Sequence, residues 1–390
     1  MQLDASGQEI GRDKFSESKI ILVPGPEITS GEYEYLPIEK IHFGTGSTKH
    51  LAAELDRKQS KKPFIITGNT IASKTDLVKK VERASGWKVA GVFSDIRQHA
   101  PSTSIRAAVT AVREARADCV ISLGGGSPID STKIVVKQLS HDFQETPIPH
   151  FSIPTTLSAA EFSHIAGMTE EKLNRKTGFR DNRMVPRIIF LDPEFTVDTP
   201  KWLWASTGIR SLDHAVEAVY SPRHQPYVDA LALQAINLLF NNLKQSSEDI
   251  TSMDKRLACQ TAAWMSYAGV VSVGTGLSHA IGRVIGATWN IPHGITSCIT
   301  LAEVMRSQAK RTPERLALIG AAQGLDTSKM KVDEAARLAA DGVSKLVAEL
   351  RLSKRLKDYG IKEADLPNIA REAASPEEQN TVMGILRNMF

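Results

Sequence analysis

The first half of the chain alternates short apolar runs with helix-like segments, and this alternation constrains the fold most. Helix-like segments lie near 47–58, 70–85, 103–116 and 128–139. Such alternation is typical of a parallel sheet covered by helices on both faces. We therefore predict an α/β fold for this half. The expected strands are Lys40–Phe43, Pro63–Thr67, Lys88–Phe93, Cys119–Leu123, His150–Ile153 and Arg187–Leu191.

The strand signal stops after Asp192-Pro193, and long helical patterns follow. We predict the domain boundary near residues 193–200, where Pro193 and Pro200 interrupt the regular patterns. We expect a polar, flexible arm over 1–30, an α/β domain over 31–195 and an all-α domain over 196–390. The clearest helical patterns of the second half are Pro226–Leu243, Lys255–Val271, Pro313–Ala322 and Val332–Leu350.

Composition excludes several classes of protein. Apolar residues make up 42% and charged residues 24% of the 390 residues, an ordinary globular balance. The net charge of +4 and the scattered basic residues give no case for nucleic acid. No apolar run approaches the roughly 18 residues that span a membrane. Three widely spaced cysteines, without a C-x-x-C motif, argue against a disulfide framework and favour a cytoplasmic location.

An apolar strand runs straight into three glycines and a helix start, in the sequence C-V-I-S-L-G-G-G-S-P-I-D-S-T-K. Glycines let the backbone approach a ligand, and a helix N-terminus favours a pyrophosphate. This is neither a G-x-G-x-x-G motif nor a Walker loop. A cofactor-phosphate loop and a simple tight turn both remain open. The three glycines are Gly124, Gly125 and Gly126.

The helix after these glycines has good start signals. Ser127 suits the N-cap, Pro128 the first helical position and Asp130 the third. A second loop follows the next strand, where Thr155 and Thr156 would bond a ribose or phosphate, unless they only form a threonine-rich turn. Both loops are expected at the carboxyl ends of parallel strands, where ligands bind.

Three histidines come from separate segments of the second half. His279 and His293 lie fourteen residues apart, and His214 sits on another amphipathic stretch. A lone histidine is usually a core residue, but three suggest one shared pocket. Arg210, four residues before His214, shares its helix face, whereas the adjacent Asp213 does not.

At this point the chain resembles the iron-containing alcohol dehydrogenase superfamily, from about residue 32 to the C-terminus. The motifs that carry the resemblance are F-G-T-G, G-G-G-S-P-I-D-S-T-K, I-P-T-T, T-G-I-R-S-L-D-H-A-V-E-A, G-L-S-H-A and N-I-P-H-G. The branch most similar to the chain is maleylacetate reductase, on the stretches T-T-L-S-A-A-E-F-S-H-I-A-G-M-T-E and R-K-T-G-F-R-D-N-R-M-V-P-R. The resemblance implies an N-terminal dinucleotide-binding domain, a cleft before a helical domain, and a homodimer.

The resemblance also implies which residues form the site. Metal-dependent members use an aspartate and three histidines, which match His214, His279 and His293, but Arg210 stands at the aspartate position. A guanidinium there would repel a divalent ion. We therefore expect no metal, with Arg210 stabilising developing charge and one histidine supplying a proton.

Three further positions bear on ligands. The family often has another histidine where this chain has Arg283, which would grip a carboxylate unless it is solvated or salt-bridged. Gly68 stands where many NAD-preferring members have an aspartate, so NAD and NADP both remain open. Lys176 matches a lysine near the nicotinamide ribose, although a surface lysine is as good an interpretation.

These expectations converge on an NAD(P)H-dependent, metal-independent reductase of a small anionic unsaturated or keto acid, similar to maleylacetate reductase. Two alternatives remain. In the first alternative, the chain is a metal-dependent alcohol dehydrogenase that tolerates Arg210. Alternatively, the altered pocket, with Arg283 in place of a histidine, serves a non-redox lyase or isomerase reaction.

Overall fold

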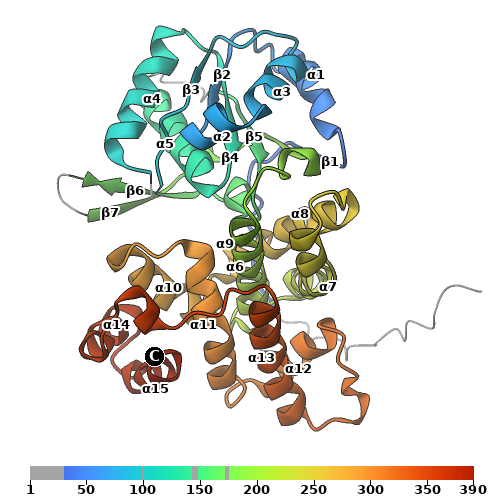
Figure 1. The fold of residues 1–390 in the computed structure, drawn as a ribbon, viewed down its shortest axis with the longest axis vertical. Coiled ribbons are helices and arrows are strands. Elements are labelled where there is room, and N and C mark those ends of the chain that lie inside the picture. The colour runs from blue at the N-terminus through green and yellow to red at the C-terminus, as the bar shows by residue number, and fades with distance from the viewer. Residues whose placement is uncertain (1–29, 99, 143–147, 172–174) are drawn as a thin grey trace, which may run out of the picture.

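The computed structural model describes residues 30–98, 100–142, 148–171 and 175–390. The predicted N-terminal arm therefore lies outside the described residues, apart from Ser30. The chain forms an α/β lobe and a helical lobe, which are joined where β8 leads into α6 (Figure 1). This matches the predicted fold class.

The α/β lobe is built on a six-stranded parallel sheet with the strand order β1-β8-β5-β4-β2-β3. All six strands were predicted, with ends that shift by a few residues. In the register, Gly124 at the end of β4 pairs with Pro154 at the end of β5, so the two predicted ligand loops leave the sheet side by side. The strands are β1 (Lys40–Phe43), β2 (Pro63–Ile66), β3 (Gly91–Phe93), β4 (Cys119–Gly124), β5 (His150–Pro154) and β8 (Ile188–Leu191).

Side chains that alternate along the strands fill two separate cores. Phe64 and Val120 pack with α4 and α5 on one face, while Ile65 and Ile121 pack with α1 and α3 on the other. Period-two alternation into two apolar faces is what a doubly covered sheet requires. The helices are η1 (Ser47–His50), α1 (Leu51–Arg57), α2 (Asn69–Lys74), α3 (Leu77–Ala84), α4 (Ser102–Glu114) and α5 (Gly126–Asp142).

Two predicted helices differ from those observed. The single helix predicted over 70–85 is broken into α2 and α3, because Thr75 adopts an extended backbone with a φ of −134°. Helix α5 begins at Gly126, two residues before the predicted start. Ser127 is therefore inside the first turn and is not the N-cap, because the glycine backbone enters the helical conformation earlier than the capping pattern indicated.

An antiparallel hairpin of β6 (Ile165–Glu170) and β7 (Arg175–Arg180) was not predicted. Neither segment has an apolar run or a clean alternation, so strand periodicity was too weak to detect. In Figure 1 the hairpin extends from the α/β lobe beside the gap between the two lobes. The short 3-10 helices near it are η2 (Ala160–Phe162), η4 (Asn182–Met184) and η5 (Pro193–Phe195).

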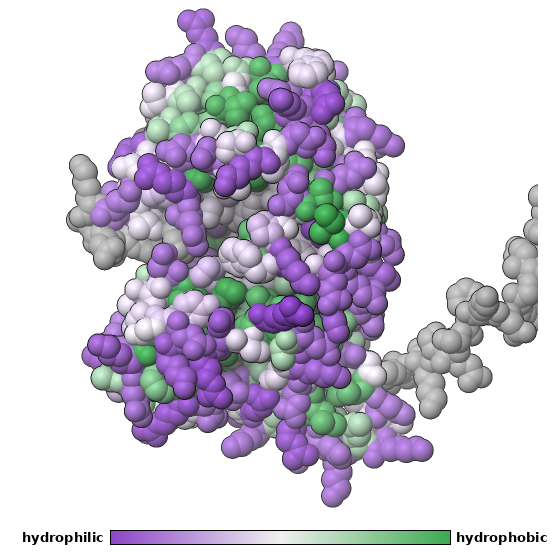
Figure 2. Space-filling view, viewed as in Figure 1, coloured by the Kyte–Doolittle hydropathy of each residue, from purple (hydrophilic) through white to green (hydrophobic). Residues whose placement is uncertain are grey.

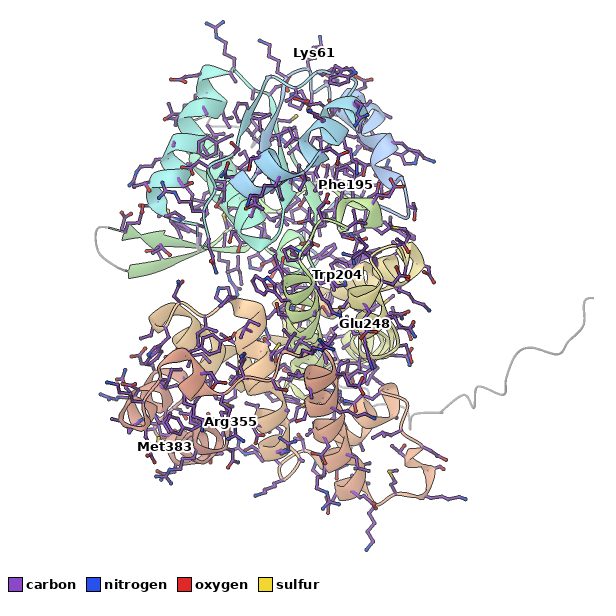
Figure 3. The ribbon with its side chains drawn as sticks, in the orientation of Figure 1. Lys61, Phe195, Trp204, Glu248, Arg355 and Met383 are labelled. Atoms are coloured by element: carbon purple, nitrogen blue, oxygen red, sulfur yellow. The ribbon has the colours of Figure 1, made fainter. Side chains whose placement is uncertain are left out.

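The helical lobe packs around one continuous apolar core. Its centre is α6, whose Trp204 is fully buried near the sheet and is labelled in Figure 3. Buried Arg256 stacks over the Trp204 ring at 4.0 Å and donates to Thr196, so this cation is satisfied without a carboxylate. The early helices are α6 (Lys201–Tyr220), α7 (Pro226–Glu248), α8 (Met253–Tyr267), α9 (Val270–Val273), α10 (Leu277–Thr288) and α11 (His293–Gln308).

The chain ends in a further set of helices, of which α13, α14 and α15 pack on α10 or α11, while α12 packs mainly on α13 and α7. These are α12 (Pro313–Ala322), η6 (Thr327–Lys329), α13 (Val332–Glu349), η7 (Leu356–Tyr359), η8 (Glu363–Asp365), α14 (Leu366–Ala373) and α15 (Gln379–Met389). Hydrophilic residues cover most of the face shown in Figure 2, with smaller hydrophobic areas among them.

No single helix within the described ranges is long and apolar enough to cross a membrane. One pair, 253–273 with 277–288, passes the length and composition test only jointly and is bent by 100°. All three cysteines are free and buried, as the absence of a disulfide pattern indicated.

Candidate active site

Helix α6 carries a stripe of charged residues that face α10 and α11. Arg210, Asp213 and Glu217 follow one another at intervals of three and four residues, which places them on one side of the helix. His214 is displaced from Asp213 around the helix, as expected, yet both residues contact His279. Sequence reasoning set Asp213 aside because it neighbours His214, and it missed Glu217, although the spacing of both from Arg210 was a usable signal.

His279, near the start of α10, lies against both carboxylates. Its Nδ1 is 2.7 Å from Glu217 Oε2 and 3.5 Å from Asp213 Oδ2, as close ionic contacts rather than aligned hydrogen bonds. Burial and Arg210 act to lower the pKa of His279, but the two carboxylates outweigh them and raise it above its ordinary value. His279 is therefore the imidazole of this site that favours the charged form.

Asp213 Oδ2 is the meeting point of the cluster. It accepts hydrogen bonds from Ser278 Oγ at 2.9 Å and from Ser297 Oγ at 2.6 Å. Arg210 Nη1 lies 3.7 Å away. Burial alone would raise the pKa of Asp213, but His279, Arg210 and Ser297 together lower it. This fully buried carboxylate is thus ionised and links three helices.

Glu217 closes the N-terminus of α10. Its carboxylate accepts the backbone N–H groups of Gly276 and Ser278 and the hydroxyl of Tyr220. The first N–H groups of a helix have no partner within the helix, and a negative charge is favourable there. Glu217 therefore fixes where α10 begins, and with it the position of His279.

Arg210 is held at the edge of the cluster. Its Nη1 donates to Ser297 Oγ at 3.1 Å, and its side chain remains 19% exposed. Burial lowers the pKa of Arg210, while Asp213 and Glu217 oppose that shift. The guanidinium stays charged, because arginine is not deprotonated in proteins.

The arrangement does not fit the metal that the resemblance implies. Two carboxylates, one guanidinium and one imidazolium sum to no net charge. In the described part of the chain, Asp213, Glu217 and His279 are the set of potential ligand atoms that lie within 4.8 Å of one another, and the three matched histidines are not such a set. The oxygens of that set already accept hydroxyl and N–H groups, and Arg210 adjoins them. A divalent ion would add uncompensated charge beside a fixed cation.

His214 lies beside His279 with a different charge. The two ring centroids are 4.8 Å apart, and the Tyr267 ring meets His214 edge-on with centroids 4.9 Å apart. Burial, with the charges of His279 and Arg210, keeps the pKa of His214 well below its ordinary value. The site therefore holds a neutral imidazole next to a charged one.

The structure places the other two predicted residues nearer to solvent. His293 is the exposed first residue of α11, one turn before Ser297, and α10 approaches it at Gly286. Arg283 is exposed one turn after His279 on α10, and no acidic side chain pairs with it among the residues the structure describes. Their roles in catalysis and in substrate binding stay predictions.

The glycine loop has backbone features that require glycine. Gly124 has a φ of +142°, which other residues rarely adopt. A Cβ at Gly125 would lie 2.9 Å from Thr156 Cγ2, and one at Gly126 would meet Ser158. Thr155 is fixed by donation of its N–H to the Gly124 carbonyl at 2.9 Å. The two predicted ligand loops thus pack directly on each other, and their role in cofactor binding stays a prediction.

The remaining predicted cofactor residues have mixed surroundings. Asp130 accepts from the fully buried Lys133 at 2.9 Å, so part of its carboxylate is already engaged. A Cβ at Gly68 would lie 3.2 Å from the Ile96 carbonyl, so tight packing also favours glycine there. The backbone of Lys176 in β7 pairs with that of Thr169 in β6, and its side chain is not among those that the structure describes. Their contacts to a cofactor stay predictions.

Comparisons with known proteins agree with this architecture. The family model for iron-containing alcohol dehydrogenase matches residues 38–193, and the model for the C-terminal part of the same family matches residues 204–385. Maleylacetate reductase from a Rhizobium species is 30% identical over 90% of this chain and 95% of its own length. Lactaldehyde reductase from Escherichia coli is 27% identical over 86% of this chain and 91% of its own length.

A solved structure supports the fold. Sulfoacetaldehyde reductase from Bifidobacterium kashiwanohense, in complex with NAD+, superposes with a TM-score of 0.82 and 21% identity, over 93% of this chain and 99% of that chain. At this identity the likeness concerns the fold alone. The named relatives are oxidoreductases, which disfavours the non-redox alternative.

Proposed function

Because the chain belongs to the iron-containing alcohol dehydrogenase family and is an oxidoreductase, we propose that it is a metal-independent, NAD(P)H-dependent reductase of a small anionic unsaturated or keto acid, such as maleylacetate. The observation that carries this proposal is Arg210, which is anchored on Ser297 where metal-dependent members place a carboxylate ligand. Similarity to maleylacetate reductase supports the substrate class.

In the proposed reaction, a bound nicotinamide would supply hydride to an electron-poor carbon of the substrate. Negative charge then builds on an enolate or carbonyl oxygen, and Arg210 stabilises it as a preorganised cation. The charged His279 supplies the proton that completes the reduction, and neutral His214 donates a hydrogen bond. Arg283, which has no acidic partner in the described chain, holds a substrate carboxylate in a bidentate manner.

The test compares NADH and NADPH oxidation with maleylacetate and with lactaldehyde as substrates. Wild-type protein is expected to reduce maleylacetate, with full activity after exhaustive chelation and without stoichiometric metal by elemental analysis. Arg210→Ala should lower kcat on the order of 100-fold or more, because a fixed transition-state charge is lost. Arg210→Lys is the matched control, which keeps the charge and should retain part of the activity.

Two results would contradict the proposal. One is stoichiometric iron or zinc whose removal abolishes turnover, which would favour the metal-dependent alcohol dehydrogenase. The other is an Arg210→Ala enzyme whose kcat falls less than a few-fold. The same activity assay, run with NADH and with NADPH, decides which cofactor is preferred.

A further inference from the structure

Tyr267, the last residue of α8, connects the two lobes beside the histidines. Its hydroxyl donates to Ser163 Oγ at 3.0 Å, across 104 residues of sequence. Its ring meets the His214 ring edge-on, with centroids 4.9 Å apart and planes at 90°. One side chain therefore contacts both a catalytic candidate and a loop of the α/β lobe.

Ser163, which accepts the hydrogen bond of Tyr267, is itself held by residues of the α/β lobe. Ser163 Oγ accepts the Ile165 N–H at 3.0 Å and donates to the Ile165 carbonyl at 3.3 Å. That carbonyl also accepts from Lys133 Nζ at 3.0 Å. Lys133 is fully buried on α5, the helix that follows the glycine loop. A continuous polar path thus runs from α5 to the phenol of Tyr267.

A second contact docks the same loop on the same helix. Phe162 stacks on Trp264, with centroids 6.3 Å apart and an interplanar angle of 16°. Trp264 lies three residues before Tyr267 and shares its face of α8. Adjacent residues Phe162 and Ser163 therefore meet two residues on the same face of α8, so the loop cannot shift along the helix without loss of both contacts.

His214 depends on packing for its orientation. Its buried Nδ1 has no hydrogen-bond partner among the described residues. The rings that the structure places against it are those of Tyr267 and His279. An edge-to-face contact has a preferred geometry, so the tyrosine ring restricts the plane of the imidazole.

We propose that Tyr267 is a positioning residue through which the cofactor lobe sets the orientation of His214. The ring holds the imidazole, and the bond to Ser163 holds the ring. The inference rests on the proposed reductase function only in its kinetic readout. As a positioning residue, Tyr267 acts through His214, so its loss should reduce kcat and leave cofactor binding nearly unchanged.

The experiment uses variants that separate the ring from the hydroxyl. Tyr267→Phe removes only the link to Ser163 and should lower kcat about five-fold, the value of one net hydrogen bond. Tyr267→Leu also removes the ring and should lower kcat between about 10-fold and 100-fold, because misplaced catalytic groups are this costly. The KM for the nicotinamide cofactor should change less than about two-fold.

Two controls test the specificity of the effect. Ser163→Ala also removes the Ser163 bonds to Ile165, so its kcat should fall at least as far as that of Tyr267→Phe. The double variant should be no worse than Ser163→Ala alone, because Tyr267→Phe then has no bond left to remove. Tyr33→Phe removes a tyrosine hydroxyl that donates to Ala268, the next residue of the chain, at 2.7 Å, and should leave kcat unchanged. Equal losses in Tyr33→Phe and Tyr267→Phe would overturn the proposal, as would additive losses in the double variant.

A spectroscopic measurement tests the proposal even if the enzyme reduces none of the tested substrates. Histidine side-chain NMR spectra, with the His214 signals assigned by His214→Asn, should show one sharp set in the wild type. In Tyr267→Leu, that set should broaden or split while the signals of buried His150 in β5 stay unchanged. Unchanged His214 signals would overturn the proposal whatever the substrate is.

Discussion

The glycine loop and the ion cluster of α6 are built in opposite ways. The loop is one contiguous stretch, and its shape depends on backbone features such as the φ of +142° at Gly124. The cluster draws side chains from α6, α10 and α11, and Asp213 bonds to a serine 84 residues away. A backbone-built site can be recognised from local sequence, whereas a side-chain-built site depends on which charges the fold buries together.

This difference predicts different sensitivities. In the loop, an added methyl group should cause harm through steric contact. In the cluster, a change of charge without a change of shape should be enough, because buried charges depend on their partners. Each of the following tests sharpens or breaks this contrast.

The largest effect is expected from Asp213→Asn, which keeps the shape but removes the charge. The cluster would then carry a net positive charge on partly buried Arg210 and buried His279, and the free energy of unfolding should fall by about 3–5 kcal/mol. Urea denaturation would measure it. Asp254→Asn, at a carboxylate that is 77% exposed, is the control and should have almost no effect. An equally small effect at Asp213 would remove the distinction between the two regions.

Glu161 tests whether buried charge also matters in the α/β lobe. Burial, opposed by its own backbone and by Lys133, raises the pKa of Glu161 to about 7. Between these two pKa values the folded state retains a proton that the unfolded state has released. The stability from this group is therefore fully present below the ordinary pKa of 4.5 and is lost as the pH rises towards 7. The loss is up to about 3 kcal/mol.

Glu161→Gln should flatten this dependence, as measured by denaturant unfolding between pH 4.5 and 8. Glu248→Gln, at an exposed carboxylate that is labelled in Figure 3, is the matched control and should keep the wild-type slope. If Glu161→Gln also kept the wild-type slope of unfolding free energy against pH, the Glu161 carboxyl would be no source of pH dependence in this lobe.

The smallest effect is expected from Gly125→Ala. The new Cβ would lie 2.9 Å from Thr156 and push apart the two ligand loops. Stability should fall by about 1–3 kcal/mol, and the Kd for NADH in a fluorescence titration should rise about 10-fold. Gly178→Ala is the control, because a Cβ there meets nothing within 4 Å. Unchanged cofactor affinity in Gly125→Ala would argue against a phosphate role for the loop.

The sequence alone determined the features that depend on local chemistry. Apolar runs with helical spacers specified six parallel strands, and glycines after β4 marked the loop, because hydrophobic periodicity and backbone freedom are properties of neighbouring residues. Three residues of the α6–α10 cluster, Arg210, His214 and His279, were also identified. The hairpin of β6 and β7 was missed, because its polar residues carry no periodic signal.

Only the tertiary structure decided which charged residues lie close together. Asp213 and Glu217 become part of the site because α10 places His279 between them, and Tyr267 because the loop at Ser163 reaches α8. Likewise, the opposite protonation preferences of His214 and His279 follow from surroundings that the fold assembles. The physical reason is that Coulomb energy and desolvation depend on distance in space and on burial, and neither is encoded in sequence separation.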